Sequence, residues 1–182
     1  MSLSIDYLHL IVMVHGLEGN SNDLRLWKTG LEQLYPLSNY EFLLCTSNHN
    51  LTHESILDQG ARITQEVQSF LSQKDKLPNK ISFIGHRLVQ PGSLFWSTNY
   101  FFSMGALLVR IAANSNELEP YRPLFGDFLS LCGPHSGCYY MDSDVVKAGL
   151  WFYEKWKKAN SLKQLALRGM ILIHPSKVIF FF

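Results

Sequence analysis

Two stretches decide the fold, K-I-S-F-I-G-H at Lys80–His86 and S-M-G-A-L-L-V-R at Ser103–Arg110. The first places β-branched and aromatic residues before a glycine, which predicts a short buried strand that ends at its Gly-His pair. The second predicts a helix that opens at its Ser-Met-Gly. Residues 87–102 separate the two stretches. Without that segment the ends would join as Gly-His-Ser-Met-Gly, a serine between glycines on a turn from strand to helix.

The same alternation of buried strands and amphipathic helices runs through most of the chain. Nearly unbroken apolar runs such as 8–14 are typical of strands buried on both faces of a parallel sheet. Strands are predicted at 8–14, 41–45, 81–84 and 125–132. Helices are predicted after Asn20 or Ser21, after Ser55, from Ser103 to Asn114, and after Ser143 or Asp144. This order predicts an α/β fold, a parallel sheet with helices on both faces.

A serine on such a turn suits acyl transfer. That chemistry needs an exposed nucleophile at a strand end, two backbone N–H groups for the developing oxyanion, and a histidine oriented by a carboxylate. Ser103 is the candidate nucleophile, and the candidate oxyanion donors are the N–H groups of Met104 and of Leu17, in the His-Gly-Leu loop after the first strand. The neighbours expected to shape the turn are Gly85, His86 and Gly105.

Plainer interpretations of these residues stay open. Ser103 can simply cap a helix, Gly85 can simply end a strand, and the His-Gly pair after the first strand can be an ordinary turn. His135 is better explained as structural, and His174 could act as a base only beside an acid. No Asp and His follow Ser103 in a pattern that indicates a triad, because the later aspartates fall mid-strand (Asp127) or at helix caps.

The composition excludes several classes of function. The chain has 182 residues with a net charge of +1, so no basic field indicates nucleic acid as a partner. The motifs of metal sites, phosphate loops and dinucleotide sites are absent from the sequence, which predicts neither a metal nor a cofactor. The three cysteines predict reduced thiols in an intracellular protein. No apolar run is long enough for a transmembrane segment, which predicts a cytoplasmic protein; peripheral contact with a membrane is compatible with the sequence.

The chain resembles the putative serine esterase (lipase-like) family of α/β-hydrolases, on the branch that forms the C-terminal domain of a large eukaryotic protein group. The resemblance rests on H-L-I-V-M-V-H-G-L-E-G-N at 9–20, I-S-F-I-G-H at 81–86, S-M-G-A-L-L-V-R at 103–110, F-L-S-L-C-G-P-H-S-G at 128–137 and G-L-W-F-Y-E-K at 149–155. It covers residues 8–168, with 87–102 as an inserted segment and 169–182 as a tail unlike the family. It implies hydrolysis of a carboxyl or lipid ester, in lipid metabolism, with Ser103 as the nucleophile.

Two departures from the family change the expectation for this chain. Members carry the triad Asp and His in a later part of their sequence, so we expect a truncated, partial α/β-hydrolase fold that lacks the C-terminal strands. The segment 87–102 also splits the nucleophile elbow. Both departures predict an inactive or impaired enzyme. The alternatives are a non-catalytic interaction or regulatory module, with protein partners unknown, and a mis-spliced fragment.

The splicing alternative has a basis in the codons that the sequence permits. Arg87 as AGG and the run Phe101-Phe102-Ser103 as TTT-TTC-AGT would supply a splice donor and an acceptor, and removal of the segment between them would restore a serine codon. Gly169-Met170 as GGT-ATG would supply a second donor. Sequencing of the mature transcript tests this hypothesis, because both segments would be absent from it.

Overall fold

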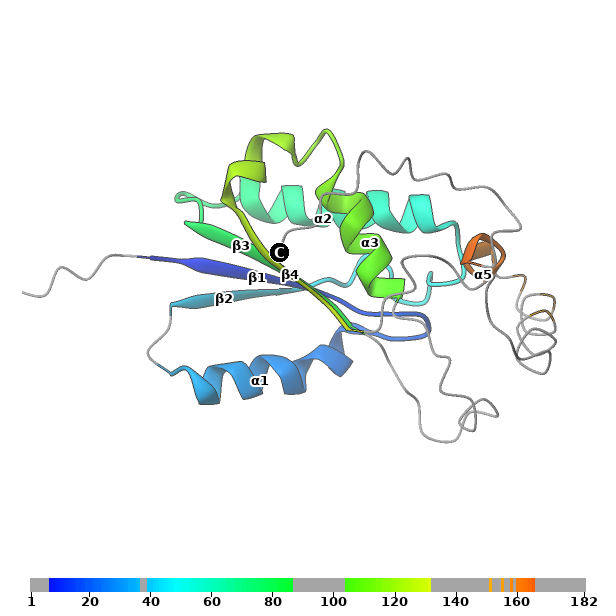
Figure 1. Ribbon diagram of the computed structural model, residues 1–182, viewed down its shortest axis with the longest axis horizontal. Helices are drawn as coiled ribbons and strands as arrows, with labels where there is room; N and C mark the ends of the chain where they lie inside the picture. Colours follow the sequence, from blue (N-terminus) through cyan, green and yellow to red (C-terminus); the bar gives the residue numbers. More distant parts are fainter. Residues whose placement is uncertain are drawn as a thin grey trace, which may run out of the picture.

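A parallel β-sheet forms the centre of the protein (Figure 1). The computed structural model describes residues 7–36, 39–86, 104–131, 151, 155, 158 and 160–165. Within these residues the strand order is β2-β1-β3-β4, and every neighbouring pair is parallel. The strands are β1 (His9–Val14), β2 (Tyr40–Leu44), β3 (Lys80–Gly85) and β4 (Phe125–Ser130). The predicted α/β fold class is confirmed as a partial α/β fold.

Helices cover both faces of this sheet. Figure 1 shows α1 on one face and α2 and α3 on the other. The α-helices are α1 (Arg25–Leu34), α2 (Ile56–Ser72), α3 (Met104–Ala113) and α5 (Asn160–Leu165), and the 3-10 helices are η1 (Ser21–Leu24) and η2 (Glu119–Leu124). The predicted cap at Asn20 is confirmed, because its side chain accepts the backbone N–H of Asn22 at 2.8 Å. None of the described helices combines the length and apolar character needed to cross a bilayer.

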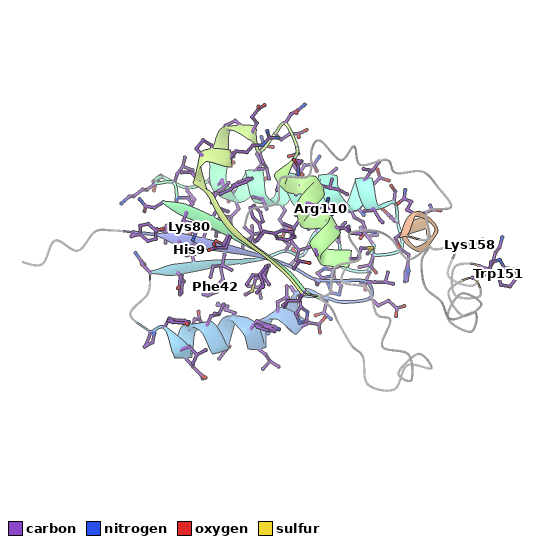
Figure 2. The ribbon with its side chains drawn as sticks, in the orientation of Figure 1. His9, Phe42, Lys80, Arg110, Trp151 and Lys158 are labelled. Atoms are coloured by element: carbon purple, nitrogen blue, oxygen red, sulfur yellow. The ribbon has the colours of Figure 1, made fainter. Side chains whose placement is uncertain are left out.

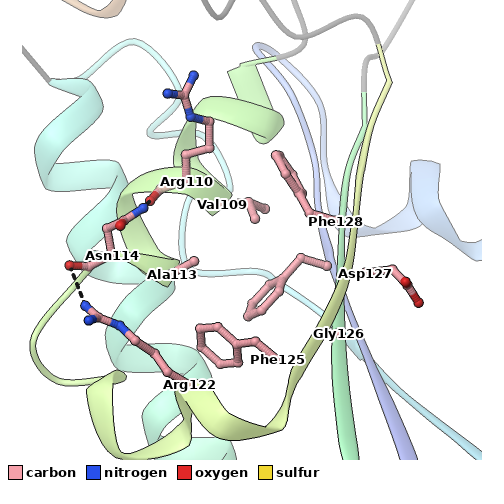
Figure 3. Close-up of a pocket in the computed structure, with 10 residues that line it drawn as sticks. Val109, Arg110, Ala113, Asn114, Arg122, Phe125, Gly126, Asp127 and Phe128 are labelled. Carbon is pink, nitrogen blue, oxygen red and sulfur yellow. Dashed lines mark hydrogen bonds between the residues drawn. The ribbon is translucent and has the colours of Figure 1, made fainter. Parts of the chain in front are cut away.

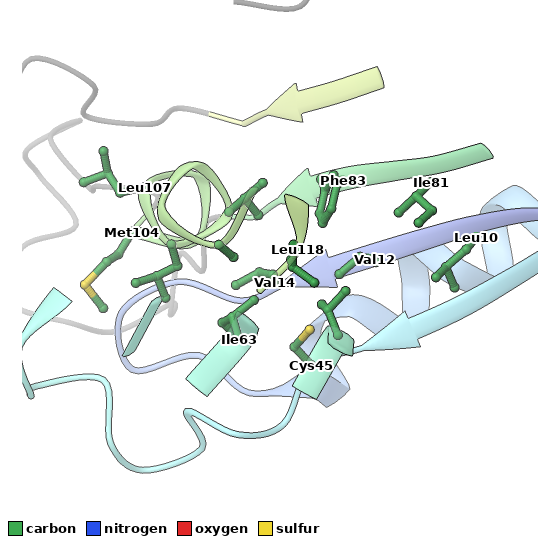
Figure 4. Packing of buried hydrophobic residues seen from close by; sticks show 14 of the residues in the cluster. Leu10, Val12, Val14, Cys45, Ile63, Ile81, Phe83, Met104, Leu107 and Leu118 are labelled. Carbon is green, nitrogen blue, oxygen red and sulfur yellow. The ribbon is translucent and has the colours of Figure 1, made fainter. Parts of the chain in front are cut away.

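The central strand β1 is buried on both faces, which explains its nearly unbroken apolar sequence. Leu10, Val12 and Val14 join the larger cluster, which includes buried side chains of α2 and α3 (Figure 4). Ile11 and Met13 join a smaller cluster, with Leu24 and partly buried side chains of α1 and β2. Figure 2 places Phe42 of β2 on the side of the sheet that faces α1. Alternate side chains of one strand therefore hold both helical layers.

Helix α1 buries only some of its apolar side chains. Leu26 and Leu34 are apolar, yet they are 83% and 72% exposed. The helix instead meets the sheet through Leu31, which lies two turns after Leu24, the last residue of η1. Because Leu26 is two residues from Leu24, it projects from the opposite side of the helix.

Some predictions lie outside the described residues. They concern the helix after Ser143 or Asp144, Cys132, Cys138, and the segments 87–102 and 169–182. The predicted domain boundaries at 8 and 168 also stay predictions. The 3-10 helix η2, which begins with Glu119-Pro120, was not anticipated.

Candidate active site

The ends of β1 and β3 lie side by side and bring two predicted loops together. Val14 pairs with Gly85 in the register of these strands, so His15 and His86 each come next in the chain. The backbone N–H of His86 also donates to the carbonyl of Val14 at 2.8 Å. In a parallel sheet the carboxyl ends of neighbouring strands share one edge, which is where α/β proteins bind their ligands.

The first turn of α3 packs directly on these strand ends. A Cβ on Gly105 would lie 2.4 Å from the carbonyl oxygen of Val14 and 3.1 Å from that of His86. A Cβ on Gly85 would lie 2.4 Å from the Cα of Ala106. Real Cβ atoms do not approach other atoms this closely, so both positions need glycine. The two halves of the split motif therefore meet in space, although residues 87–102 separate them in the sequence.

Ser103 itself lies outside the described residues, and so do His135 and His174. The segment 87–102 is predicted to split the elbow at this serine. On either side of the segment and Ser103, Gly105 lies close to the carbonyl of His86, because a Cβ on Gly105 would be 3.1 Å from that oxygen. Met104 is the first residue of α3 and its side chain is fully buried. Its backbone N–H is among the helix N-terminal donors that have no carbonyl partner within the helix, and the helix dipole favours negative charge there.

The loop after β1 forms a tight turn over 16–19. The N–H of Gly19 donates to the carbonyl of Gly16 at 3.1 Å, and Glu18 has a φ of 54°. The same carbonyl accepts Nδ1–H of His15 at 3.1 Å. Because the C=O and N–H of a trans peptide point in opposite directions, these two bonds direct the N–H of Leu17 away from the turn. That N–H has no hydrogen-bond partner among the residues described here.

His15 is fixed in one tautomer by this contact. A carbonyl can only accept, so Nδ1 carries the proton and Nε2 is left as the acceptor. The side chain is 1% exposed, and Nε2 has no hydrogen-bond partner in the described part of the chain. Burial lowers the pKa of His15, and the hydrogen bond to Gly16 opposes this effect only in part. His15 is therefore a neutral residue that shapes the loop.

His86 lies at the mouth of the elbow and is half-buried. Its ring meets Trp27 edge to face, with 5.9 Å between the ring centroids, and burial lowers the pKa of His86. Asp23 is the acid that acts electrostatically on both His15 and His86. The Asp23 carboxylate, however, accepts the N–H of Asn20 at 2.7 Å as part of a capping box. No Asp–His hydrogen bond of the triad kind joins these described residues.

Asp127 has a structural explanation. It lies on the edge strand β4, 2.6 Å from Nζ of Lys80, and its backbone N–H donates to the hydroxyl of Ser82 at 3.0 Å. The ammonium of Lys80 lowers the pKa of Asp127. Figure 2 shows Lys80 beside His9, at the amino ends of their strands and hence away from the elbow. Asp127 is thus a surface partner of Lys80.

A pocket lies between α3, η2 and β4 (Figure 3). Phe83, Phe125, Phe128 and Val109 supply most of its apolar wall. The guanidinium of Arg122 closes one side by donating to the backbone carbonyl of Asn114 at 3.1 Å. None of the predicted site residues lines this pocket. Across the described part of the chain, no group of three or more His, Cys, Asp or Glu side chains could hold a metal ion.

The geometry agrees with a comparison against known families. The family described as putative serine esterase matches residues 4–177. The chain belongs to this family. The predicted resemblance to this family is thereby confirmed. The roles predicted for Ser103, Leu17 and Met104 stay predictions.

One feature of the site was missed by sequence reasoning. Thr52, in the loop after β2, accepts the N–H of Glu18 through its hydroxyl at 3.0 Å. No spacing rule links a threonine to a turn that lies far from it in the chain, so no sequence signal could have found this contact. The capping box, in contrast, has a signal in the sequence, because Asn20 and Asp23 have the spacing of that motif.

Proposed function

We propose that this chain is a serine ester hydrolase with impaired activity and that Ser103 is its nucleophile. The contact between the two halves of the elbow carries the proposal. Gly85 approaches Ala106, and Gly105 approaches the carbonyl of His86, on either side of Ser103. A nucleophile elbow requires this close approach of strand and helix, because only then does the serine sit at the strand end beside the helix N-terminus.

The residues suggest the following chemistry. The Ser103 oxygen attacks the ester carbonyl carbon, and the N–H groups of Leu17 and Met104 stabilise the negative oxygen that forms. The tetrahedral intermediate collapses to an acyl-serine and releases the alcohol, which takes up the proton that the serine gave to a base. Water then attacks the acyl-serine and releases the acid. The orientation of the Leu17 N–H supports its role, because the Gly16 carbonyl is held on the opposite side of that peptide.

The proposed impairment rests on the split elbow and on the triad partners of Ser103, because no Asp and His follow it in the sequence in a pattern that indicates a triad. Within the described residues, His15 donates through Nδ1 to Gly16 and Asp23 accepts from Asn20, so this pair does not form the carboxylate–imidazole link of a triad. Loss of the triad leaves roughly 10³–10⁴-fold catalysis over water from oxyanion stabilisation and binding. We therefore expect turnover far below that of a complete serine esterase.

The substrate is proposed to be a small molecule with a carboxyl ester, and a lipid ester is the finer proposal. A cytoplasmic location with peripheral contact to membranes belongs to the same proposal. The net charge of +1 gives only a weak overall attraction to anionic lipid headgroups.

A fluorophosphonate probe tests the function directly. We expect slow labelling of the intact chain, located at Ser103 by peptide mass spectrometry and absent from Ser103→Ala. Ser130→Ala is the matched control, because Ser130 ends the neighbouring strand β4, and it should leave labelling unchanged. Labelling as fast as in a complete serine hydrolase would refute the impairment. A folded chain that takes up no probe would refute the esterase and favour the non-catalytic module.

A further inference from the structure

The turn over 16–19 is held in an unusual conformation. Among its two central residues, only Glu18 has a positive φ, at 54°. This is the φ pattern of a type II turn, whose third position normally carries glycine. For a residue with a Cβ, this left-handed conformation costs roughly 1–2 kcal/mol of conformational energy. The turn can avoid this cost by flipping its central peptide, between Leu17 and Glu18, into the type I form.

Thr52 binds the peptide that would flip. Its hydroxyl accepts the N–H of Glu18 at 3.0 Å, and this N–H belongs to the central peptide of the turn. Thr52 is 3% exposed, so water cannot readily replace it. The ring of His53 makes a second contact between the same segments, with Nε2 3.5 Å from a carboxylate oxygen of Glu18.

The backbone of Thr52 is fixed from two other elements. Its carbonyl accepts Nε2–H of Gln59, in α2, at 3.0 Å and the hydroxyl of Ser161, in α5, at 3.0 Å. Gln59 and Ser161 are both fully buried. Helix α5 is itself anchored at the start of α2, because Oε1 of Gln164 accepts the N–H of Ile56 at 2.7 Å. Figure 1 shows α5 at this end of α2.

We propose that Thr52 is a positioning residue that anchors the turn over 16–19 through the N–H of Glu18 and thereby fixes where Leu17, the candidate oxyanion donor in the same turn, lies relative to α3. The inference rests on the proposed function for its catalytic part. Loss of the hydroxyl removes the acceptor that Thr52 provides for the Glu18 N–H, and with it the bond that selects the strained turn. The turn is then no longer anchored to the loop after β2, and Leu17 shifts with it relative to the first turn of α3.

Two substitutions at position 52 and one control separate this role from a general loss of packing. Thr52→Val keeps the shape and the backbone carbonyl but removes the hydroxyl, whereas Thr52→Ser keeps the hydroxyl. Thr64→Val is the matched control, because Thr64 is equally buried at 3% and its hydroxyl donates within α2 to the carbonyl of Gly60. The measurements are amide hydrogen exchange at Glu18 and the rate of fluorophosphonate labelling.

We expect Thr52→Val to speed exchange at Glu18 at least tenfold and to slow labelling about 10²-fold, as misplacement of an oxyanion donor does. Thr52→Ser and Thr64→Val should stay within about threefold of the wild type in both measurements. Unchanged exchange at Glu18 in Thr52→Val would overturn the inference. So would faster exchange with unchanged labelling. If the wild-type chain takes up no probe, the proposed function fails together with the catalytic part, and the exchange at Glu18 still decides whether Thr52 holds the turn.

Discussion

Gly85 and Ala106 are in backbone contact although the expected insertion lies between them in the sequence. A Cβ on Gly85 would lie 2.4 Å from the Cα and 2.5 Å from the N of Ala106. The atoms it would meet belong to the backbone of α3 and cannot rotate away. The contact shows that the end of β3 and the start of α3 form one unit whatever path residues 87–103 take.

Gly105→Ala should destabilise the protein strongly. Its Cβ would lie 2.4 Å from the Val14 carbonyl oxygen and 2.9 Å from that of His15, so α3 would have to move off the strand ends. Overpacking of this kind costs about 1–3 kcal/mol. Urea denaturation should show that loss. Gly30→Ala is the control, because a Cβ there meets nothing within 4 Å and should stabilise α1 by about 0.5–1 kcal/mol. Equal effects of the two changes would contradict the close approach.

Stability should fall on acidification, and His15 should contribute to the fall. Burial lowers the folded-state pKa of His15 from the ordinary value of 6.5, so the unfolded chain binds the proton more tightly. The contribution of His15 to the free energy of unfolding is complete above about pH 6.5 and is lost as the pH falls below that value. Below the folded-state pKa of His15 the loss levels off. Each tenfold difference in proton affinity corresponds to about 1.4 kcal/mol.

His15→Asn tests this assignment, since an asparagine amide can still donate to Gly16 but does not titrate in this range. Urea unfolding at several pH values between 7.5 and 5 should give a shallower dependence for the variant. Some pH dependence of the stability will remain in the variant, because burial also lowers the pKa values of His9 and His86. Identical pH dependence in the variant and the wild type would show that His15 is not the titrating group.

Gln164→Leu should weaken the anchoring of α5. Oε1 of Gln164 accepts the N–H of Ile56, the first residue of α2, and Nε2 contacts the hydroxyl of Ser55 at 3.2 Å. This side chain satisfies one of the free donors at the start of α2, as a cap residue would. Its loss should cost about 1 kcal/mol in urea denaturation. Gln65→Leu, on the exposed side of α2, should change the stability by less than about 0.5 kcal/mol.

Cys45 should be inert in the folded protein. It is fully buried, and burial raises the pKa of its thiol well above the usual value, with a smaller contribution from the charge of Glu66. Only the thiolate is nucleophilic, so alkylation at pH 7.5 requires unfolding. Peptide mass spectrometry after brief iodoacetamide treatment should find Cys45 unmodified in buffer and fully modified in urea. Rapid modification of Cys45 in buffer would contradict its burial.

Much of the fold could be predicted from local pattern. The apolar run at 8–14, the Ser55 cap and the helical spacing of Ile56, Ile63 and Val67 each predicted an element that the structure contains. Which apolar side chains of a helix are buried was less predictable. Leu26 and Leu34 are apolar yet exposed, because burial depends on which side of α1 faces the sheet. Propensity and periodicity act locally, whereas burial depends on neighbours that are distant in sequence.

The candidate site, too, could be predicted from the sequence only in part. By itself, the sequence determined the residue types and their order: glycines at 85 and 105, a His-Gly-Leu loop after the first strand, and enough family pattern to indicate a serine esterase. Only the tertiary structure decided that the two halves of the elbow meet and that Thr52 holds Glu18. The physical reason is that both are contacts between distant segments, created when parallel strand ends share one edge and helices pack across them. No spacing in the chain encodes such a distance.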